Sequence, residues 1–311
     1  GFKDDKVKYG INARVMLNKK NRLIVSLGNR RDVEQIGVSL TTSNDVLGRS
    51  FASSSFFSSG TNNKLTNVNL TNLGFEIEPV KNLVFESSFS YRTLSSASSE
   101  FKLDYFTDNS YTTTSNKITQ SEVNFLINYT PKRKMVGYGV DRIDVDLNYP
   151  RFFVSYSQGL KGVFDSDFNY SKLQLYYRQP LLIGGFGRLF STLEIGKTFG
   201  AVPLSLMGII PGNQSYFIID NTYNLLNYYD FVADQYTSLH LEHNFNGKLF
   251  ARVPLLRKLN WREIIGVKAV YGSVSDENIA LNASGQSYQA PVNGYYEYSA
   301  GIGNIFKVMR V

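Results

Sequence analysis

Apolar and polar side chains alternate at every second residue in many segments of this chain. The first such segment has apolar residues at positions 7, 9, 11, 13, 15 and 17, and similar alternation returns within residues 83–95 and 236–246. Successive side chains of a β-strand point to opposite faces, so each segment has one apolar and one polar face. Segments of about ten residues match the length of a tilted strand that crosses a bilayer. The pattern therefore predicts an all-β protein, a transmembrane β-barrel.

We expect eleven strands and the beginning of a twelfth, joined in an antiparallel up-and-down order. An apparent change of phase between Leu70 and Leu73 indicates a β-bulge in the third strand. The predicted strands span residues 6–17, 22–30, 64–78, 83–95, 117–130, 151–159, 168–179, 187–199, 236–246, 261–272, 294–304 and 306 onward.

The connections between these strands alternate between compact and long. Outer-membrane barrels have short turns on the periplasmic side and long loops outside, which assigns a side of the membrane to each connection. The compact connections are 18–21, 79–82 and 182–187, with 131–150 and 247–260 placed on the same side, and the long ones are 31–63, 96–116, 200–235 and 273–293.

The connection at 200–235 is the least ordinary part of the chain, because it carries many apolar residues of its own. Such a loop either folds back into the barrel lumen as a plug or latch, or packs on itself outside the barrel. Within it, residues 224–231 form the one short helix that the sequence predicts. The candidate latch residues are Pro211, Gly212, Asn213, Gln214, Ser215 and Tyr216.

Composition leaves two classes of β-protein open, a membrane barrel and a soluble β-sandwich. Hydrophobic residues make up 42% of the 311 residues, the mean hydropathy is −0.21, and no apolar run is long enough for a helical span. The chain has 21 Tyr and 22 Phe but 1 Trp, and tyrosine suits the boundary between membrane and water. Sandwich strands are usually about five to six residues long. The predicted strands are longer, which favours the barrel.

Charge and cysteine content narrow the expected partners. The formal net charge is +7 and there is no Cys, which excludes disulfides and thiolate metal sites. A basic chain can bind nucleic acid, but these Lys and Arg residues stand at strand ends and turns, where they suit lipid headgroups. The chain begins without a signal peptide and stops within an expected strand. We therefore expect residues 1–311 to be one barrel domain, truncated at both ends.

The chain offers little for catalysis. His240 and His243 flank Glu242 but lie on opposite strand faces, and a zinc site needs three or four convergent ligands. No G-x-S-x-G motif is present, so Ser238 beside His240 is a remote hydrolase candidate. The glycine-rich stretch 184–187 lacks the Gly-Lys-Ser/Thr ending of a phosphate loop. We expect no enzyme activity, no cofactor and no metal site.

Charged side chains recur on the polar faces of the predicted strands. They form either a cross-paired polar wall or the lining of a selective conduit, and the sequence does not separate these two interpretations. The lumen-facing polar residues that we single out are Glu194, His240, Glu242 and Lys268.

The second half of the chain, roughly residues 150–311, resembles a known family. The stretches VPLSLMGIIPGNQSYF and DFVADQYTSLHLEHNFNGKLFARVPLLRKLNWRE are similar to a Bacteroidota outer-membrane barrel family of unknown function, whose members often carry an N-terminal carboxypeptidase-regulatory-like domain. That family is in turn similar to the BamA/TamA barrels, which insert or translocate outer-membrane proteins. Those barrels have sixteen strands, so the resemblance implies that this chain holds about twelve of them.

The same resemblance identifies residues 200–235 with the long loop between the eleventh and twelfth strands of that superfamily. The superfamily loop usually carries an Arg-Gly-aromatic tip that docks on the inner wall of the barrel. The corresponding residues here, Gly212 to Tyr216, include no Arg, so the latch chemistry differs.

The resemblance implies a location in the outer membrane of a Gram-negative bacterium and a role in outer-membrane biogenesis or protein transport. The alternative is an accessory barrel subunit of a larger secretion or nutrient-uptake complex. The expected partners are outer-membrane lipid, lipopolysaccharide and other envelope proteins, and we expect no nucleic acid.

Overall fold

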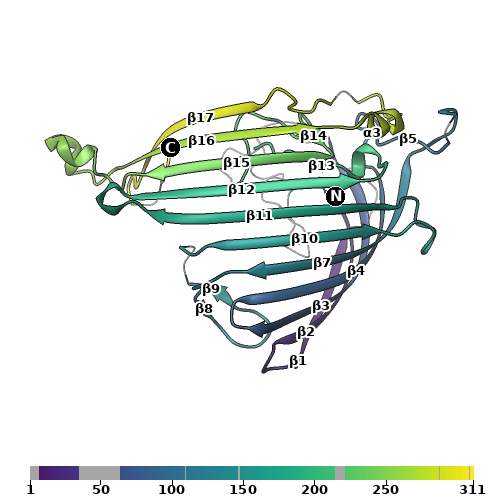
Figure 1. Cartoon of the computed structure of the whole chain (residues 1–311), viewed down its shortest axis with the longest axis horizontal. Coiled ribbons are helices and arrows are strands. Elements are labelled where there is room, and N and C mark those ends of the chain that lie inside the picture. Colours follow the sequence, from purple (N-terminus) through teal and green to yellow (C-terminus); the bar gives the residue numbers. More distant parts are fainter. Residues whose placement is uncertain are drawn as a thin grey trace.

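A computed structural model of the chain contains one large antiparallel sheet of eleven strands (Figure 1). The structure describes residues 7–34, 64–108, 110–145, 148–213, 221–286, 288–307 and 309–311. Each strand of the large sheet pairs with the sheet strands that precede and follow it in the chain. The strands are β1 (Tyr9–Asn18), β2 (Leu23–Glu34), β3 (Thr66–Val80), β4 (Leu83–Ser96), β7 (Lys117–Tyr129), β10 (Arg151–Gly159), β11 (Tyr170–Leu182), β12 (Arg188–Phe199), β15 (Gln235–Asn244), β16 (Arg262–Ser273) and β17 (Tyr295–Gly303).

The described residues of the connections contain small elements only. None of the helices among the described residues is long and apolar enough to cross a membrane. The two-stranded pairs are β5 (Tyr105–Phe106) with β6 (Thr114–Ser115), β8 (Met135–Val136) with β9 (Ile143–Asp144) and β13 (Gly208–Ile209) with β14 (Val232–Ala233). The helical turns are η2 (Gly184–Phe186), η3 (Leu204–Leu206), η4 (Phe250–Arg252), α2 (Pro254–Arg257) and α3 (Asp276–Leu281).

The all-β class and the antiparallel up-and-down order agree with the sequence prediction, and the eleven strands lie within a few residues of their expected positions. The expected strand from 306 onward is absent from the described residues. The chain turns back there instead, because Ile305 and Met309 form an isolated bridge and Val311 bonds to Ile302. Within the described part of the chain β1 and β17 do not pair, so neither a closed barrel nor the expected strand count is confirmed.

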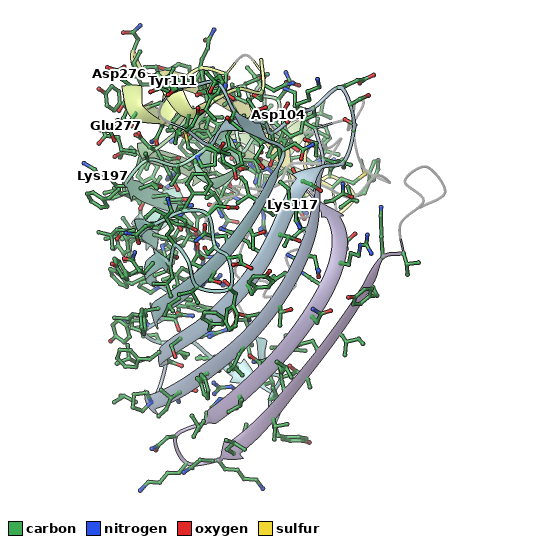
Figure 2. All side chains as sticks on the ribbon, turned by 90° about the vertical axis from the view of Figure 1, so that its right-hand side faces the viewer. Asp104, Tyr111, Lys117, Lys197, Asp276 and Glu277 are labelled. Carbon is green, nitrogen blue, oxygen red and sulfur yellow. The ribbon has the colours of Figure 1, made fainter. Side chains whose placement is uncertain are left out.

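The connections fall into two groups at opposite ends of the sheet, because consecutive strands run antiparallel. One end, which we call the compact end, holds the turns after β1, β3, β7, β11 and β15 (from the bottom to the left in Figure 1). The other, the long end, holds the connections after β2, β4, β10, β12 and β16. Figure 2 is viewed from the long end, with Asp104 and Tyr111 of the β4–β7 connection and Asp276 and Glu277 of α3 labelled there. The alternation expected from the loop lengths is thus present.

The outer face of the sheet carries exposed apolar side chains. Phe125, Leu239 and Ile265 are 50%, 38% and 47% exposed although they stand in the middle of regular strands or near it. A contiguous apolar surface of this kind marks contact with lipid or another protein. Other residues of the outer face are Leu27, Phe75, Phe85, Ile127, Phe152, Val154, Leu173, Leu175, Ile195 and Val267.

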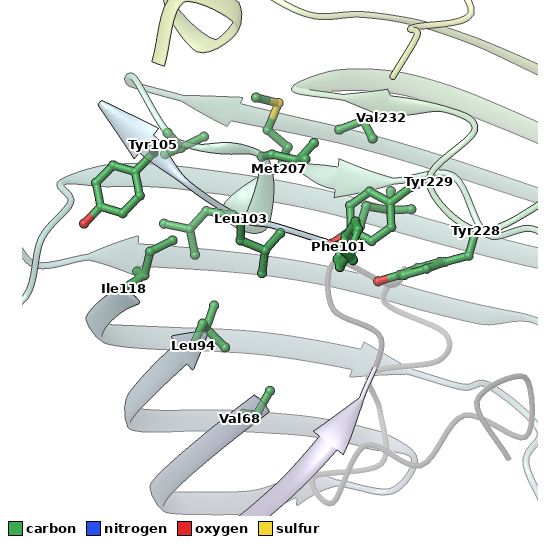
Figure 3. Close-up of a cluster of buried hydrophobic side chains, with 14 of the residues drawn as sticks. Val68, Leu94, Phe101, Leu103, Tyr105, Ile118, Met207, Tyr228, Tyr229 and Val232 are labelled. Carbon is green, nitrogen blue, oxygen red and sulfur yellow. The ribbon is translucent and has the colours of Figure 1, made fainter. Parts of the chain in front are cut away.

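The inner face holds the main hydrophobic core, which lies toward the long end. Val68 on β3, Leu94 on β4 and Ile118 on β7 pack against residues of the connections, among them Leu103 and Met207 (Figure 3). The β12–β15 connection contacts strands from β3 to β17 on this one face. The sheet therefore curls around that connection.

The predicted bulge between Leu70 and Leu73 is absent. The pairing of β3 with β2 and β4 is continuous there, and its one irregularity lies between Ile77 and Val80. Leu70 packs against the inner core, whereas Leu73 is 39% exposed on the outer face. The phase change in the sequence arises because the inner face is apolar near the long end and polar toward the compact end.

Candidate functional site

The connection between β12 and β15 covers the inner face of the sheet, and we call its described residues, 200–213 and 221–234, the inward connection. Most of its apolar side chains are buried, with Val202, Met207, Tyr223 and Val232 each 0% exposed, while Leu225 is 78% exposed. Burial of this apolar surface is the main force that holds the segment in place. Of the expected latch residues, Gln214, Ser215 and Tyr216 lie outside the described residues.

Three lysines fix the backbone of the inward connection. Each ammonium group donates a hydrogen bond to a backbone carbonyl, and the lysines come from the residues just before β3, from β11 and from β16. Hydrogen bonds from charged donors are stronger than neutral ones, so these contacts specify where the segment lies. The pairs are Lys64 Nζ with the Tyr228 carbonyl at 2.9 Å, Lys172 Nζ with that of Leu206 at 3.1 Å and Lys268 Nζ with that of Thr222 at 2.6 Å.

Tyr223 is the most deeply placed aromatic residue of the inward connection. Its hydroxyl lies 2.8 Å from Ser238 Oγ on β15 and donates a 2.7 Å hydrogen bond to the Ala269 carbonyl on β16. Its ring meets the His240 ring edge-on, with 4.8 Å between the ring centroids. A single side chain therefore joins the connection to two adjacent strands.

Glu297 on β17 holds the next residues of the connection. Its carboxylate accepts the backbone N–H groups of Asn224 and Leu225, both at 2.8 Å, and the Tyr295 hydroxyl at 2.9 Å. Lys268 Nζ is 3.9 Å from the same carboxylate. These contacts satisfy both oxygens of a side chain that is 5% exposed, as a buried charge requires.

The helix predicted for residues 224–231 is wrong, because the structure has turns there. Tyr229 has φ +68°, in the left-handed region that does not continue an α-helix. Asn227 donates its backbone N–H to the Asp230 carboxylate at 2.7 Å, which also favours a local turn. In this conformation Tyr228 and Tyr229 both enter the inner core.

Pro211, Gly212 and Asn213 pair with Tyr223 and so fix the neck of the inward connection. Tyr223 donates its N–H to the Pro211 carbonyl at 2.8 Å, and Asn213 donates to the Tyr223 carbonyl at 2.7 Å. At Gly212 an added Cβ would lie 2.3 Å from the carbonyl oxygen of Leu226. Glycine is therefore required here by the close approach of two backbone segments.

The four polar residues expected to face the lumen all lie on the inner face. Glu194 on β12 accepts the Tyr236 hydroxyl at 2.7 Å, and His240 on β15 stands directly opposite Lys268 on β16. Glu242 accepts two hydrogen bonds from the Arg310 guanidinium, at 3.0 and 2.6 Å. A cavity of about 280 Å³ is lined by His240, Glu242 and Lys268 but not by Glu194.

The sequence did not indicate a second set of inward contacts, at the compact end. The β8–β9 hairpin folds onto the inner face, where Arg22 donates to the Gly139 and Val140 carbonyls at 2.8 and 3.2 Å. The carboxylate of Glu78 on β3 lies 3.3 Å from Arg22 Nε and also forms an ion pair with Arg142. The only sequence signal is the density of charged residues in 131–144, which does not reveal their partners.

Asp144 on β9 closes this hairpin onto β10. Its carboxylate is 2.5 Å from Arg133 Nε and 3.4 Å from an Arg151 guanidinium nitrogen. Burial raises the pKa of Asp144, but hydrogen bonds from Arg133 and Tyr149 and the charges of Arg133 and Arg151 outweigh it and lower the pKa below the usual value. The carboxylate is thus held in its charged form.

Comparison with solved structures shows a similar fold in BamA. The crystal structure of Haemophilus ducreyi BamA lacking POTRA domains 1–3 aligns with a TM-score of 0.54 at 11% identity, over 94% of this chain and 55% of that chain. The chain thus spans about half the length of that BamA. Pseudomonas aeruginosa OccK11 (OpdR) aligns over 95% of this chain and 83% of its own, but with a TM-score of 0.25 and 9% identity it carries no argument.

Comparison at the level of sequence gives the family. No curated protein matches the chain. A family model does match residues 1–284, under the description "Family of unknown function (DUF5686) C-terminal domain". The chain therefore belongs to this family of unknown function.

Proposed function

We propose that this domain is the wall of an outer-membrane β-barrel that acts in outer-membrane biogenesis or protein transport. The observation that carries the proposal is the contrast between the two faces of the sheet. The outer face exposes apolar side chains such as Phe125 and Leu239, while the inner face is packed against the inward connection. Lipid on one side and folded polypeptide on the other would account for both faces.

The edges of the sheet support a barrel that is continued by further strands. Within the described residues, β1 and β17 each have a neighbour on one side only. An unpaired strand edge is costly in hydrocarbon, because its backbone N–H and C=O groups have no partner there. In the proposed mechanism, strands that continue β1 and β17 meet at a weakly paired seam, where an incoming strand adds by β-augmentation.

The inward connection would act as a latch that braces the curved wall next to this seam. Its contacts with Ser238, Ala269 and Glu297 join three neighbouring strands, β15, β16 and β17. Because it occupies the inner face toward the long end, a wide aqueous conduit is the less favoured interpretation of the polar wall. The BamA structure supports the proposed function only through its similar fold.

Depletion of the protein in a bacterium that carries it tests the biological role. We expect the abundance of several other outer-membrane proteins to fall, as measured by quantitative mass spectrometry of isolated outer membranes. Unchanged abundance of all of them would contradict a role in biogenesis. Stable co-purification with a secretion or uptake complex, together with unchanged abundance, would instead support an accessory subunit.

A complementation series tests the latch separately. Glu297→Gln replaces one carboxylate oxygen by an amide donor, so one of the two backbone N–H groups at Asn224 and Leu225 loses its acceptor. We expect this variant to rescue the depleted strain poorly. The matched control is Glu277→Gln, at an exposed position of α3, which should rescue fully. Equal rescue by both variants would argue against the latch.

A further inference from the structure

The turn between β15 and β16 carries an unusual surface at the compact end of the sheet. We call residues 247–262 the basic turn, which includes η4 and α2 and projects beyond the strand ends (Figure 1). It has five cationic residues and no Asp or Glu. Among the described residues none of the five forms an ion pair. They are Lys248, Arg252, Arg257, Lys258 and Arg262.

Apolar side chains of the basic turn are left in the open. Leu255 is 76% exposed, and Leu249, Val253 and Leu259 are 42–45% exposed. The turn is nevertheless regular, since Ala251 donates its N–H to the Gly247 carbonyl and Arg257 to that of Val253, both at 2.9 Å. Ordered apolar side chains that the chain does not cover mark a surface for an external partner.

The basic turn lies on the outer side of the sheet. Glu263 points to the same outer face of β16 as Ile265 and Val267, which are 47% and 37% exposed. Glu263 itself is only 7% exposed. It is covered because the backbone N–H of Phe250 donates to its carboxylate. The segment is thus folded toward the apolar outer face and not toward the inner core.

The neighbouring turn between β11 and β12 extends the same surface. Lys248 Nζ lies 3.8 Å from the centre of the Phe186 ring, and His243 Nε2 is 2.8 Å from the Phe186 carbonyl oxygen. Leu182 at the end of β11 is 75% exposed, and Phe186 in this turn is 52% exposed. Two adjacent turns therefore present apolar side chains next to unpaired cations, in continuity with the outer face.

We propose that the basic turn, together with residues 181–187, is an interfacial anchor that binds the anionic phospholipid headgroups of the leaflet at the compact end. A surface that binds such lipids combines apolar side chains, which reach the boundary between headgroups and acyl chains, with Lys and Arg side chains, which bind the headgroups. Charge complementarity with a negative leaflet and continuity with the apolar outer face select lipid as the occupant. This inference rests on the proposed membrane location of the sheet.

The sole tryptophan of the chain, Trp261, stands within the basic turn and gives a direct readout. The purified protein is reconstituted into vesicles of phosphatidylcholine alone or mixed with phosphatidylglycerol, each with brominated phosphatidylcholine as the quencher. We expect phosphatidylglycerol to increase the quenching of Trp261 and to shift its emission to shorter wavelength. Added salt should weaken both changes, because it screens surface charge.

A triple variant identifies the groups responsible. Arg252→Gln, Arg257→Gln and Lys258→Gln together should remove most of the phosphatidylglycerol dependence of the Trp261 signal. The matched control replaces Lys102, Lys117 and Lys161 by Gln, three exposed lysines that lie toward the long end, and should retain it. Quenching that is independent of phosphatidylglycerol in the unmodified protein, or equal in the two triple variants, would overturn the proposal.

A second probe separates failure of the anchor from failure of the membrane location. The chain has no Cys, so Leu239→Cys on the outer face can carry a single environment-sensitive fluorophore. A lipid-like signal at position 239 with an unresponsive Trp261 would reject the anchor alone. A water-like signal at position 239 would reject the membrane location on which the anchor depends.

Discussion

The hydroxyl group of Tyr223 donates a 2.7 Å hydrogen bond to the carbonyl oxygen of Ala269. The two residues are 46 positions apart in the chain, and the bond joins the inward connection to β16 from the inner side. Tyr223 is 0% exposed, so its hydroxyl has to find all its partners within the protein. The position of the whole connection on the sheet is therefore sensitive to this one group.

Tyr223→Phe removes that hydroxyl and keeps the ring. The hydrogen bonds to Ala269 and Ser238 are lost, and we expect a destabilisation of about 1–3 kcal/mol, since a buried partner left unsatisfied costs this much. Thermal unfolding in detergent, followed by circular dichroism, measures the change. Tyr271→Phe is the control, because Tyr271 also stands on β16 but is 57% exposed on the outer face. Equal stability of the two variants would show that Tyr223 does not hold the connection.

Gly212→Ala tests the close approach at the neck of the inward connection. An added Cβ would lie 2.3 Å from the Leu226 carbonyl oxygen and 2.7 Å from its carbon, so one backbone segment has to move. We expect faster proteolysis and faster amide hydrogen exchange in residues 221–233. Gly10→Ala on β1 is the control, where the nearest atom to the new Cβ is 3.7 Å away. Unchanged exchange in 221–233 would mean that the segments separate without cost.

The strands were predictable from sequence because side-chain alternation is a local property. Phe85 and Phe89 on the outer face of β4 alternate with Glu86 and Ser90 on the inner face, and no partner strand has to be known to see this. Alternation also gave the inner-face position of Glu194, His240, Glu242 and Lys268. It failed at Leu70 and Leu73, where the inner face changes from apolar to polar along one strand.

The contacts of the connections were not predictable in the same way, because they depend on residues far away in the chain. Glu297 is a polar residue of β17 by pattern, and nothing local reveals that it accepts the N–H groups of Asn224 and Leu225. The hairpin at 131–145 was expected to be a compact link, yet Arg22 and Glu78 draw it onto the inner face. A helix was expected over residues 224–231, whereas Tyr228 and Tyr229 are buried in the inner core and Tyr229 takes a left-handed conformation there.

Val154→Arg tests whether lipid covers the outer face. Val154 stands in β10 between Leu175 and Ile127 on its two neighbours and is 38% exposed. An Arg on the lipid side of a barrel costs about 2–4 kcal/mol near the bilayer midplane, so we expect a marked fall in the yield of protein folded into vesicles. Val163→Arg is a matched control, because Val163 is also 38% exposed but lies in the β10–β11 turn. If both variants insert equally well, the outer face is not in lipid.

Low pH should release the β8–β9 hairpin through Asp144. The pKa of Asp144 is lower in the folded protein than in an unfolded chain, where it is about 3.9. A group with a lowered pKa contributes stability above its unfolded value and loses it as the pH falls through the folded value. Amide protection in residues 131–145, corrected for intrinsic exchange at each pH, should therefore be constant from neutral pH to about 5 and fall below about 4.

Asp144→Asn shows whether this carboxylate is the group that titrates. The amide cannot pair as an anion with Arg133 and Arg151, so the variant should already have low protection of 131–145 at neutral pH and little further change on acidification. Asp276→Asn on α3, at the long end, should retain the profile of the unmodified protein. A variant at position 144 that still loses protection near pH 4 would show that the Asp144 carboxylate is not the group that controls the hairpin.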